Sequence, residues 1–248
     1  MKVSYEWKQV TDLGVIKRAN TLWVILIIDR LVLPLLYLIA NFTFLTPNMV
    51  TVLGMLLTFP SAYFFATGSF VAGMILQQAV LLCDAIDGKL ARLTHRTSPF
   101  GKLYDNLVDR MRSLVPMLGL IYFTYNQTQN AWFVFWGLFY LVWDLLLIYM
   151  YHEAKAMNEN KLLVDIVQKE GSFLSKIRQK LMKHRLTLLY SDIESEVVVF
   201  IIGPLLSFYY GYEAILNAMI VGTGMLALIF VIFFAVQCKI AWSQKKSQ

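Results

Sequence analysis

Charged residues are scarce in this chain. They make up 15% of its 248 residues, whereas hydrophobic residues make up 58% and the mean hydropathy is +0.59. A soluble domain usually carries about 25% charged residues, so this composition excludes an ordinary soluble protein. Cysteine is limited to Cys83 and Cys238, which excludes a disulfide framework and a cysteine zinc site. The first 20 residues lack the pattern of a cleavable signal, so we expect the first membrane helix to act as an uncleaved insertion signal.

The sequence contains several long apolar stretches. A helix needs about 20 apolar residues to cross a bilayer. Six stretches approach that length, at residues 50–66, 70–90, 103–123, 131–151, 197–210 and 214–236. The fifth contains Gly203-Pro204, where we expect a kink. The sequence therefore predicts an all-α integral membrane protein with six transmembrane helices.

Residues 22–41 form a further apolar segment that carries Asp29 and Arg30 at its middle. An unpaired charge near the bilayer centre costs at least about 2.5 kcal/mol. We therefore predict an N-terminal interfacial (juxtamembrane) helix ahead of the six transmembrane helices, with both charged side chains toward water or headgroups. A seventh span is the alternative.

Positive charge is absent from three of the predicted loops. Residues 67–69, 125–130 and 211–213 contain no Lys or Arg, whereas the loops on the other side, above all 152–196, are rich in both. The positive-inside rule then places both termini and the loop after the second span in the cytoplasm, with the protein in the inner membrane of the cell. Anionic lipid headgroups explain the net charge of +6 better than a nucleic acid does, and we expect no nucleic-acid partner.

Two consecutive helices each present an acidic face. Residues at i, i+3, i+4 and i+7 share one side of a helix, as do residues at steps of four. The positions concerned are Asp84, Asp87, Gly88 and Ala91 on the first helix and Gly101, Asp105 and Asp109 on the second. Carboxylates this close repel one another unless a cation neutralises them, and hard oxygen ligands suit Mg²⁺ or Mn²⁺. The sequence therefore predicts a divalent metal site.

The whole pattern, D-x-x-D-G-x-x-A-R-x8-G-x-x-x-D-x-x-x-D over residues 84–109, resembles the signature of the CDP-alcohol phosphotransferase (CDP-alcohol phosphatidyltransferase) family. Thr46-Pro47-Asn48 followed by Thr51 is similar to the entry of that family's first membrane helix. Beyond Asp109 the resemblance is in hydrophobic layout only. It implies an enzyme of phospholipid biosynthesis that transfers a substituted phosphate group from a CDP-linked donor to an alcohol acceptor and releases CMP.

The resemblance also implies roles for single residues. The metal ligands would be Asp84, Asp87, Asp105 and Asp109, holding two Mg²⁺ or Mn²⁺ ions, and Asp109 would be the catalytic base. The nucleotide would contact Asn48, Thr51, Asp84, Gly88, Ala91, Arg92 and Gly101. Close helix packing is the alternative reason for the small size of Gly88 and Ala91, and an ordinary snorkelling anchor is the alternative for Arg92.

The resemblance further implies two regions and a partner. Residues 1–48 would form an N-terminal cytoplasmic and interfacial helix region. Residues 49–248 would form the six-helix transmembrane catalytic domain, which includes an amphipathic cytoplasmic loop at 152–196. We also expect a homodimer.

Polar residues elsewhere are candidates for the acceptor site or its cavity. Asp144 lies inside the fourth span, where it would pair with a cation of the site or make a plain interhelical hydrogen bond. Ser191, Asp192 and Glu194 precede the fifth span. Few Lys or Arg lie inside the later spans, which favours an uncharged or zwitterionic acceptor over a phosphorylated one.

Three alternatives accompany this interpretation. The small size of the chain favours CDP-diacylglycerol as donor, but a CDP-linked headgroup and a diacylglycerol-type lipid acceptor would suit the same motif. A membrane cation- or proton-coupled transporter also uses acidic membrane residues, but it needs no D-G-x-x-A-R element and must open to both sides in turn. Membrane prenyltransferases use a different spacing of aspartates, which this chain lacks.

Overall fold

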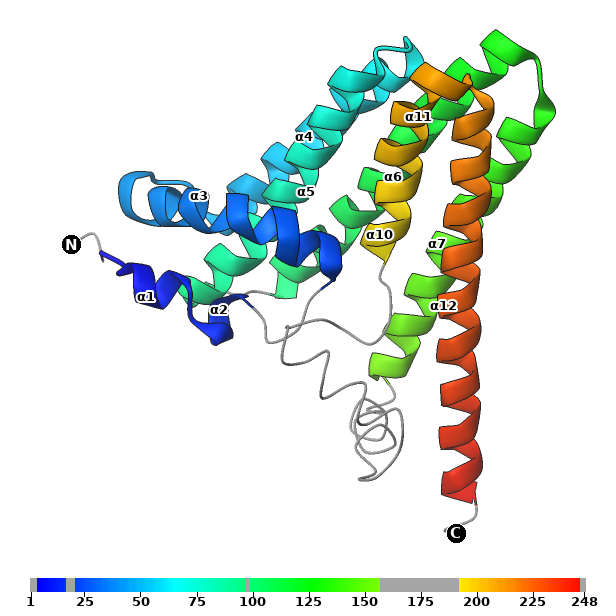
Figure 1. Ribbon diagram of the computed structural model, residues 1–248. Coiled ribbons are helices and arrows are strands. Elements are labelled where there is room, and N and C mark those ends of the chain that lie inside the picture. The colour runs from blue at the N-terminus through cyan, green and yellow to red at the C-terminus, as the bar shows by residue number, and fades with distance from the viewer. Residues whose placement is uncertain (1–3, 17–20, 97–98, 157–191, 246–248) are drawn as a thin grey trace.

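The computed structural model describes residues 4–16, 21–96, 99–156 and 192–245, which form helices and contain no strand. In chain order the elements are α1 (Trp7–Val10), α2 (Leu13–Ile16), η1 (Val24–Ile28), α3 (Asp29–Phe42), α4 (Pro47–Ala66), α5 (Phe70–Leu93), α6 (Pro99–Thr128), α7 (Ala131–Ala156), α10 (Asp192–Val197), η2 (Val198–Ile202), α11 (Gly203–Tyr210) and α12 (Glu213–Lys245). The long helices form an elongated bundle in which α4 packs against α5 and α6, and α7 packs against α12 (Figure 1). The all-α prediction is confirmed.

Six described segments are long and apolar enough to cross a membrane: 24–42, 47–66, 70–93, 131–150, 192–210 and 213–235. The protein is an integral membrane protein, and five of these segments match predicted spans. The predicted span at 103–123 is missing from the set, because α6 carries Asp105, Asp109, Arg110 and Arg112. Helix α6 nevertheless runs through the bundle beside α4 and α7, so it is a span in arrangement although not in composition.

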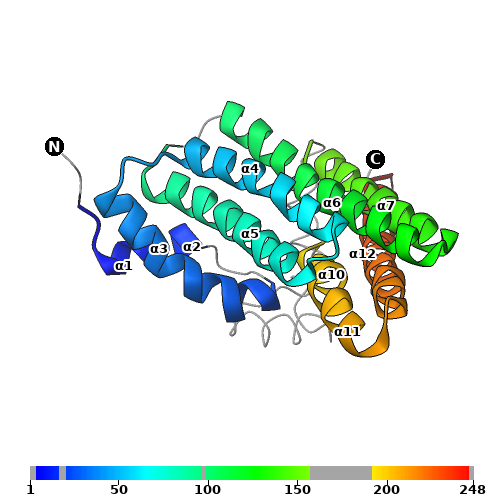
Figure 2. The same ribbon diagram turned by 90° about the horizontal axis from the view of Figure 1, so that it is seen from above.

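The segment η1–α3 meets the same criterion of length and composition, but it is oriented differently from the bundle. In Figure 1 α3 runs crosswise to α12, and Figure 2, from above, shows α3 along its length while α12 is foreshortened. Helices α4 and α5 are also slanted relative to α12 (Figure 1), and the interfacial position of η1–α3 stays a prediction.

The environment predicted for Asp29 was wrong. Its side chain is 5% exposed and pairs with Lys89 Nζ of α5 at 3.2 Å, whereas Arg30 is exposed as expected. The sequence alone offered no partner for Asp29, and a carboxylate without a partner belongs in water. The buried Lys89 supplies that partner and joins α3 to the helix that carries the acidic motif.

Two hydrophobic cores hold the bundle together. One is formed by α1 to α5 and includes Ile28, Leu36 and Leu90. The other is formed by α4 to α7 with η2 and α12 and includes Phe65 and Met219. Helix α5 contributes its early turns to the second core and its later turns to the first, so its acidic turns lie where the two cores meet.

Local signals explain two features of the helices. Thr46 caps α4, with its hydroxyl accepting a hydrogen bond from the Met49 N–H at 3.4 Å, and Pro47 occupies the first helical position, where a missing N–H costs nothing. A π turn over Val198–Ile202 directly precedes Gly203-Pro204, and in it the Gly203 N–H bonds to the Val198 carbonyl; the kink expected at Gly203-Pro204 stays a prediction.

Close packing of α4 on α6 depends on a glycine. A Cβ on Gly119 would lie 2.3 Å from the carbonyl oxygen of Ala62. The contact fixes how near α6, which carries two of the motif aspartates, approaches α4.

We predict that Asp29→Ala destabilises the protein, because Lys89 then loses this carboxylate while it stays buried. Breaking a buried ion pair costs about 3–5 kcal/mol. The midpoint of thermal unfolding in detergent should fall clearly, whereas the control Arg30→Ala, at an exposed neighbour, should change stability by less than about 0.5 kcal/mol. Equal midpoints for the two variants would contradict a stabilising role for the pair.

Candidate functional site

Three carboxylates from two helices converge at the start of α6. Asp84 of α5 and Asp105 and Asp109 of α6 each offer one oxygen atom, and these atoms lie within 4.8 Å of one another. All three residues are partly exposed. The spacing by one helical turn on α6 brings Asp105 and Asp109 to the same face, so both can approach Asp84.

The three carboxylates line a cleft of about 200 Å³. Its wall also contains Asp87, Gly88 and Arg92 from α5, as the shared helical face predicts. Two further lining residues, Val24 of η1 and Ile193 of α10, come from distant parts of the chain. The cleft is therefore enclosed by the N-terminal segment and by α10 as well as by the motif.

Asp87, the fourth predicted metal ligand, lies outside the group of three but lines the same cleft. It is 5% exposed, and its Oδ2 accepts a hydrogen bond from Thr51 Oγ1 at 2.5 Å. The Thr51 hydroxyl also lies 3.0 Å from the carbonyl oxygen of Pro47. Thr51 thus orients a carboxylate of the cleft wall.

Gly88 leaves open space at the cleft. A Cβ placed on it would meet only the Arg92 guanidinium, with Nη1 at 3.5 Å, which is an ordinary contact distance. Helix packing therefore does not require glycine at this position. Ala91 lines a neighbouring cavity of about 380 Å³ together with Val15 and Arg92.

Arg92 lines both cavities, and its Nε donates a hydrogen bond to the carbonyl oxygen of Val15 at 2.7 Å. This contact holds the guanidinium at the cleft, which a free snorkelling side chain would not require. Asn48, exposed near the start of α4, and Gly101 of α6 line neither of the two cavities.

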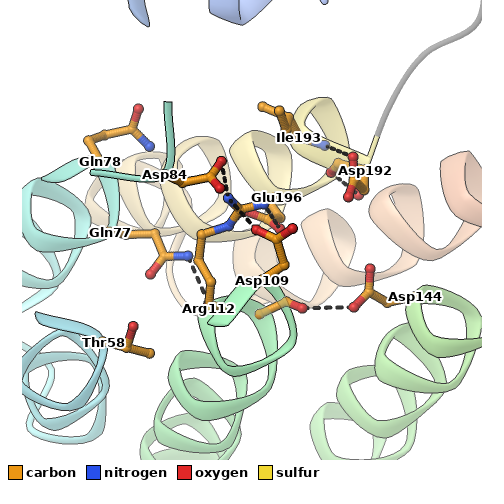
Figure 3. A network of polar contacts seen from close by, with 12 residues as sticks. Thr58, Gln77, Gln78, Asp84, Asp109, Arg112, Asp144, Asp192, Ile193 and Glu196 are labelled. Carbon is orange, nitrogen blue, oxygen red and sulfur yellow. Dashed lines mark hydrogen bonds and ion pairs between the residues drawn. The ribbon is translucent and has the colours of Figure 1, made fainter. Parts of the chain in front are cut away.

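Arg112 occupies the centre of the polar cluster, although it is not among the site residues predicted from the sequence. It is 3% exposed, and its Nε and Nη2 each donate a hydrogen bond to Glu196 at 3.1 Å. Its Nη1 lies 3.1 Å from Asp84 and 3.5 Å from Asp109 (Figure 3). The signal was present, because a charged residue within a predicted span is by default a functional candidate.

Asp144 pairs with a cation of this region, which was one of its two expected roles. It is 2% exposed, accepts a hydrogen bond from Ser113 Oγ at 2.7 Å and lies 3.3 Å from Arg110 Nη1. These contacts join α6 to α7 beside the cleft (Figure 3).

The polar residues at the start of the fifth span form hydrogen bonds with neighbouring residues and with the N-terminal segment. Asp192 accepts hydrogen bonds from the Ile193 N–H and, through its carbonyl, from Ser195 Oγ. Glu194 accepts one from the Leu22 N–H at 2.9 Å, which ties α10 to the N-terminal segment. Neither residue lines the cleft, and Ser191 lies outside the described residues.

The charges around the cleft fit a divalent cation. Of the nearby cations, Lys89 pairs with Asp29, Arg110 with Asp144 and Arg112 with Glu196, so that Arg92 of the cleft wall is the cation to set against the four motif aspartates. The four motif aspartates therefore leave an excess of negative charge at the cleft among the described residues. Clustered carboxylate oxygens with such an excess are the ligands that Mg²⁺ and Mn²⁺ prefer.

The family model described as CDP-alcohol phosphatidyltransferase matches residues 44–202. Archaetidylinositol phosphate synthase of Pyrococcus horikoshii is 38% identical over 77 residues, which are 31% of this chain and 40% of that protein. A CDP-diacylglycerol–serine O-phosphatidyltransferase of Helicobacter pylori is 33% identical over 104 residues, which are 39% of this chain and 44% of that protein. The chain thus spans less than half the length of these curated relatives.

Crystal structures of the phosphatidylinositol phosphate synthase of Mycobacterium tuberculosis have the same fold. The structure with CDP-DAG bound has a TM-score of 0.60 at 20% identity and covers 85% of this chain and 92% of that chain. The structure with manganese and citrate has a TM-score of 0.58 at 20% identity and covers 77% of this chain and 82% of that chain.

We predict that Asp84→Asn and Asp105→Asn each weaken Mn²⁺ binding to the purified protein at least about tenfold, because a neutral amide cannot offset the charge of the cation. Calorimetric titration of Mn²⁺ in detergent measures the change. The control Glu213→Gln removes an exposed carboxylate at the first turn of α12 and should leave the affinity unaltered. Equal affinities for all three variants would place the metal elsewhere.

Proposed function

The chain belongs to the CDP-alcohol phosphatidyltransferase family, and we propose that it transfers a substituted phosphate group from a CDP-linked donor to an alcohol acceptor and releases CMP. The observation that carries this proposal is the convergence of Asp84, Asp105 and Asp109 in one cleft. Gly88 and Arg92 border the same cleft and suit a diphosphate, the first by leaving space and the second by its charge.

We propose CDP-diacylglycerol as the donor. The name of the Helicobacter pylori relative contains this donor, and the Mycobacterium tuberculosis structure was solved with CDP-DAG bound. A lipid donor also suits a cleft among membrane helices, because its tails can stay in the bilayer while the headgroup reacts. In the alternative, a CDP-linked headgroup is transferred to a diacylglycerol-type acceptor. The same cleft would then bind the lipid as the acceptor and not as the donor.

The residues of the cleft divide the chemistry among them. When bound, divalent ions at Asp84, Asp87, Asp105 and Asp109 would supply the positive charge that stabilises the diphosphate and the CMP leaving group; we propose two ions, Mg²⁺ or Mn²⁺. Asp109 would take the proton of the acceptor hydroxyl as its oxygen attacks the β-phosphorus.

The remaining residues of the proposed site would bind and orient the donor. Arg92 would hold phosphate oxygens with its guanidinium, and Thr51 keeps Asp87 oriented. Asn48, Ala91 and Gly101 are proposed to contact the nucleotide, on the strength of the motif.

We propose an uncharged or zwitterionic acceptor. Arg110 and Arg112 are the cations of α6 next to the cleft, and both are matched by carboxylates, Asp144 and Glu196. A phosphorylated acceptor would have to compete with these carboxylates for a guanidinium. Asp144, and Ser191, Asp192 and Glu194 at the start of the fifth span, remain candidates for contacts with the acceptor.

The proposed setting is the inner membrane, with both termini and the cleft on the cytoplasmic side. In support, α1, α2, the end of α5, the start of α6 and the end of α12 lie toward the same side of the bundle (Figure 1). Residues 49–248 would form the catalytic domain and residues 1–48 its cytoplasmic and interfacial extension. The homodimer stays a prediction, which light scattering of the purified protein would test.

The activity test uses labelled CDP-diacylglycerol, Mn²⁺ and a panel of alcohols that includes phosphorylated and amino alcohols. We expect CMP release with an unphosphorylated alcohol, and loss of at least about 10³-fold in turnover for Asp109→Asn, with donor binding retained because three carboxylates remain. Glu213→Gln is the control. Near-normal turnover of Asp109→Asn would contradict the proposed base, and CMP release only with diacylglycerol and a CDP-linked headgroup would reverse the proposed direction.

A labelling experiment tests the proposed orientation. In a variant without Cys83 and Cys238, a cysteine at Gln127, an exposed residue near the end of α6, should react with an impermeant reagent in intact cells. A cysteine at His95, exposed after α5, should react only after the cells are opened. The reverse pattern would overturn the charge argument.

A further inference from the structure

Arg112 and Glu196 form a buried ion pair that reaches the carboxylate cluster from a different helix. The side chains are 3% and 6% exposed, and two parallel hydrogen bonds of 3.1 Å join them. Glu196 lies on α10, whereas Asp84 and Asp109 lie on α5 and α6. The pair therefore connects three helices that meet at the cleft (Figure 3).

The bidentate geometry fixes the plane of the guanidinium. With Nε and Nη2 held by Glu196, Nη1 can point in one direction only, toward Asp84 at 3.1 Å and Asp109 at 3.5 Å. The backbone at this point is fixed as well, because Gln77 Nε2 of α5 donates a hydrogen bond to the Arg112 carbonyl at 3.0 Å. Gln77 is itself 2% exposed.

We propose that Arg112 is a positioning residue, which Glu196 holds so that it cross-links Asp84 to Asp109, and that the pair sets the affinity of the cleft for its divalent cation. The proposal rests on the proposed function only for the identity of that cation. The guanidinium charge beside two carboxylates opposes the binding of a cation, and Glu196 offsets that opposition. The two members of the pair therefore act on cation affinity with opposite sign.

The test is the affinity for Mn²⁺, measured on the purified full-length protein in detergent without substrate by the paramagnetic resonance signal of free Mn²⁺. Glu196→Gln leaves the Arg112 charge uncompensated and should weaken Mn²⁺ binding at least about tenfold. Arg112→Gln should bind Mn²⁺ as tightly as the unaltered protein or more tightly. The double variant, which removes both charges and keeps similar shapes, should return to within about threefold of the unaltered protein.

Turnover supplies a second readout. At saturating Mn²⁺, Arg112→Gln should show reduced kcat with little change in the donor KM, because Asp109 loses the contact that orients it. Arg112→Lys, which keeps the charge but not the forked geometry, should not restore kcat. Restoration by Lys would show that charge alone suffices and would overturn the positioning role.

A matched control separates this inference from a general loss of packing. Tyr140→Phe removes a buried hydrogen bond to Ser195 of α10 without changing any charge, and should leave Mn²⁺ affinity within about twofold. Weaker Mn²⁺ binding in both Arg112→Gln and Glu196→Gln would reject the opposite-sign prediction, and unaltered thermal unfolding would exclude misfolding as the cause. If the unaltered protein transfers the phosphate group and only these predictions fail, the proposed function stands. If the unaltered protein binds no Mn²⁺, both the proposed function and this inference are contradicted.

Discussion

A charge among apolar helices needs a partner, and this requirement organises the structure. Buried or partly buried ion pairs join separate helices: Asp29–Lys89 links α3 to α5, Arg110–Asp144 links α6 to α7, and Arg112 links α6 to α10 through Glu196 and to α5 through Asp84. Each removes the cost of a lone buried charge and fixes a helix contact in the process. The motif aspartates outnumber the cations that face them. By the same requirement for a partner, their excess negative charge favours a bound cation.

Local patterns in the sequence predicted much of this structure. Helical periodicity placed Asp84, Asp87 and Gly88 on one face and Asp105 with Asp109 on another, and the cleft confirms that these faces meet. Contacts between residues far apart in the sequence could not be predicted from these local patterns. Arg112 and Glu196 are 84 positions apart, and nothing in the spacing of either indicates the other. The burial of Asp29 was missed for the same reason, because the environment of a charge depends on a partner that local periodicity does not identify.

Helix α6 shows how composition and arrangement can disagree. Its charged residues keep it from meeting a criterion based on apolar length, yet it lies between α4 and α7, where carboxylates and arginines neutralise one another. The segment η1–α3 is the opposite case, since it is apolar enough to cross but runs crosswise. Mean hydropathy averages over all residues of a segment. The position of the segment in the bundle also depends on whether its charged side chains are paired.

The N-terminal segment closes one side of the cleft, and that has a consequence for how the shape of the cleft can vary. Val24 lines the cleft, and Val15 binds Arg92 through its carbonyl. Both residues precede the region that the family model matches, which begins at residue 44. One wall of the cleft is therefore built from residues that precede the region matched by the family model. Substitutions at this wall would change the shape of the cleft while the carboxylates of α5 and α6 stay in place.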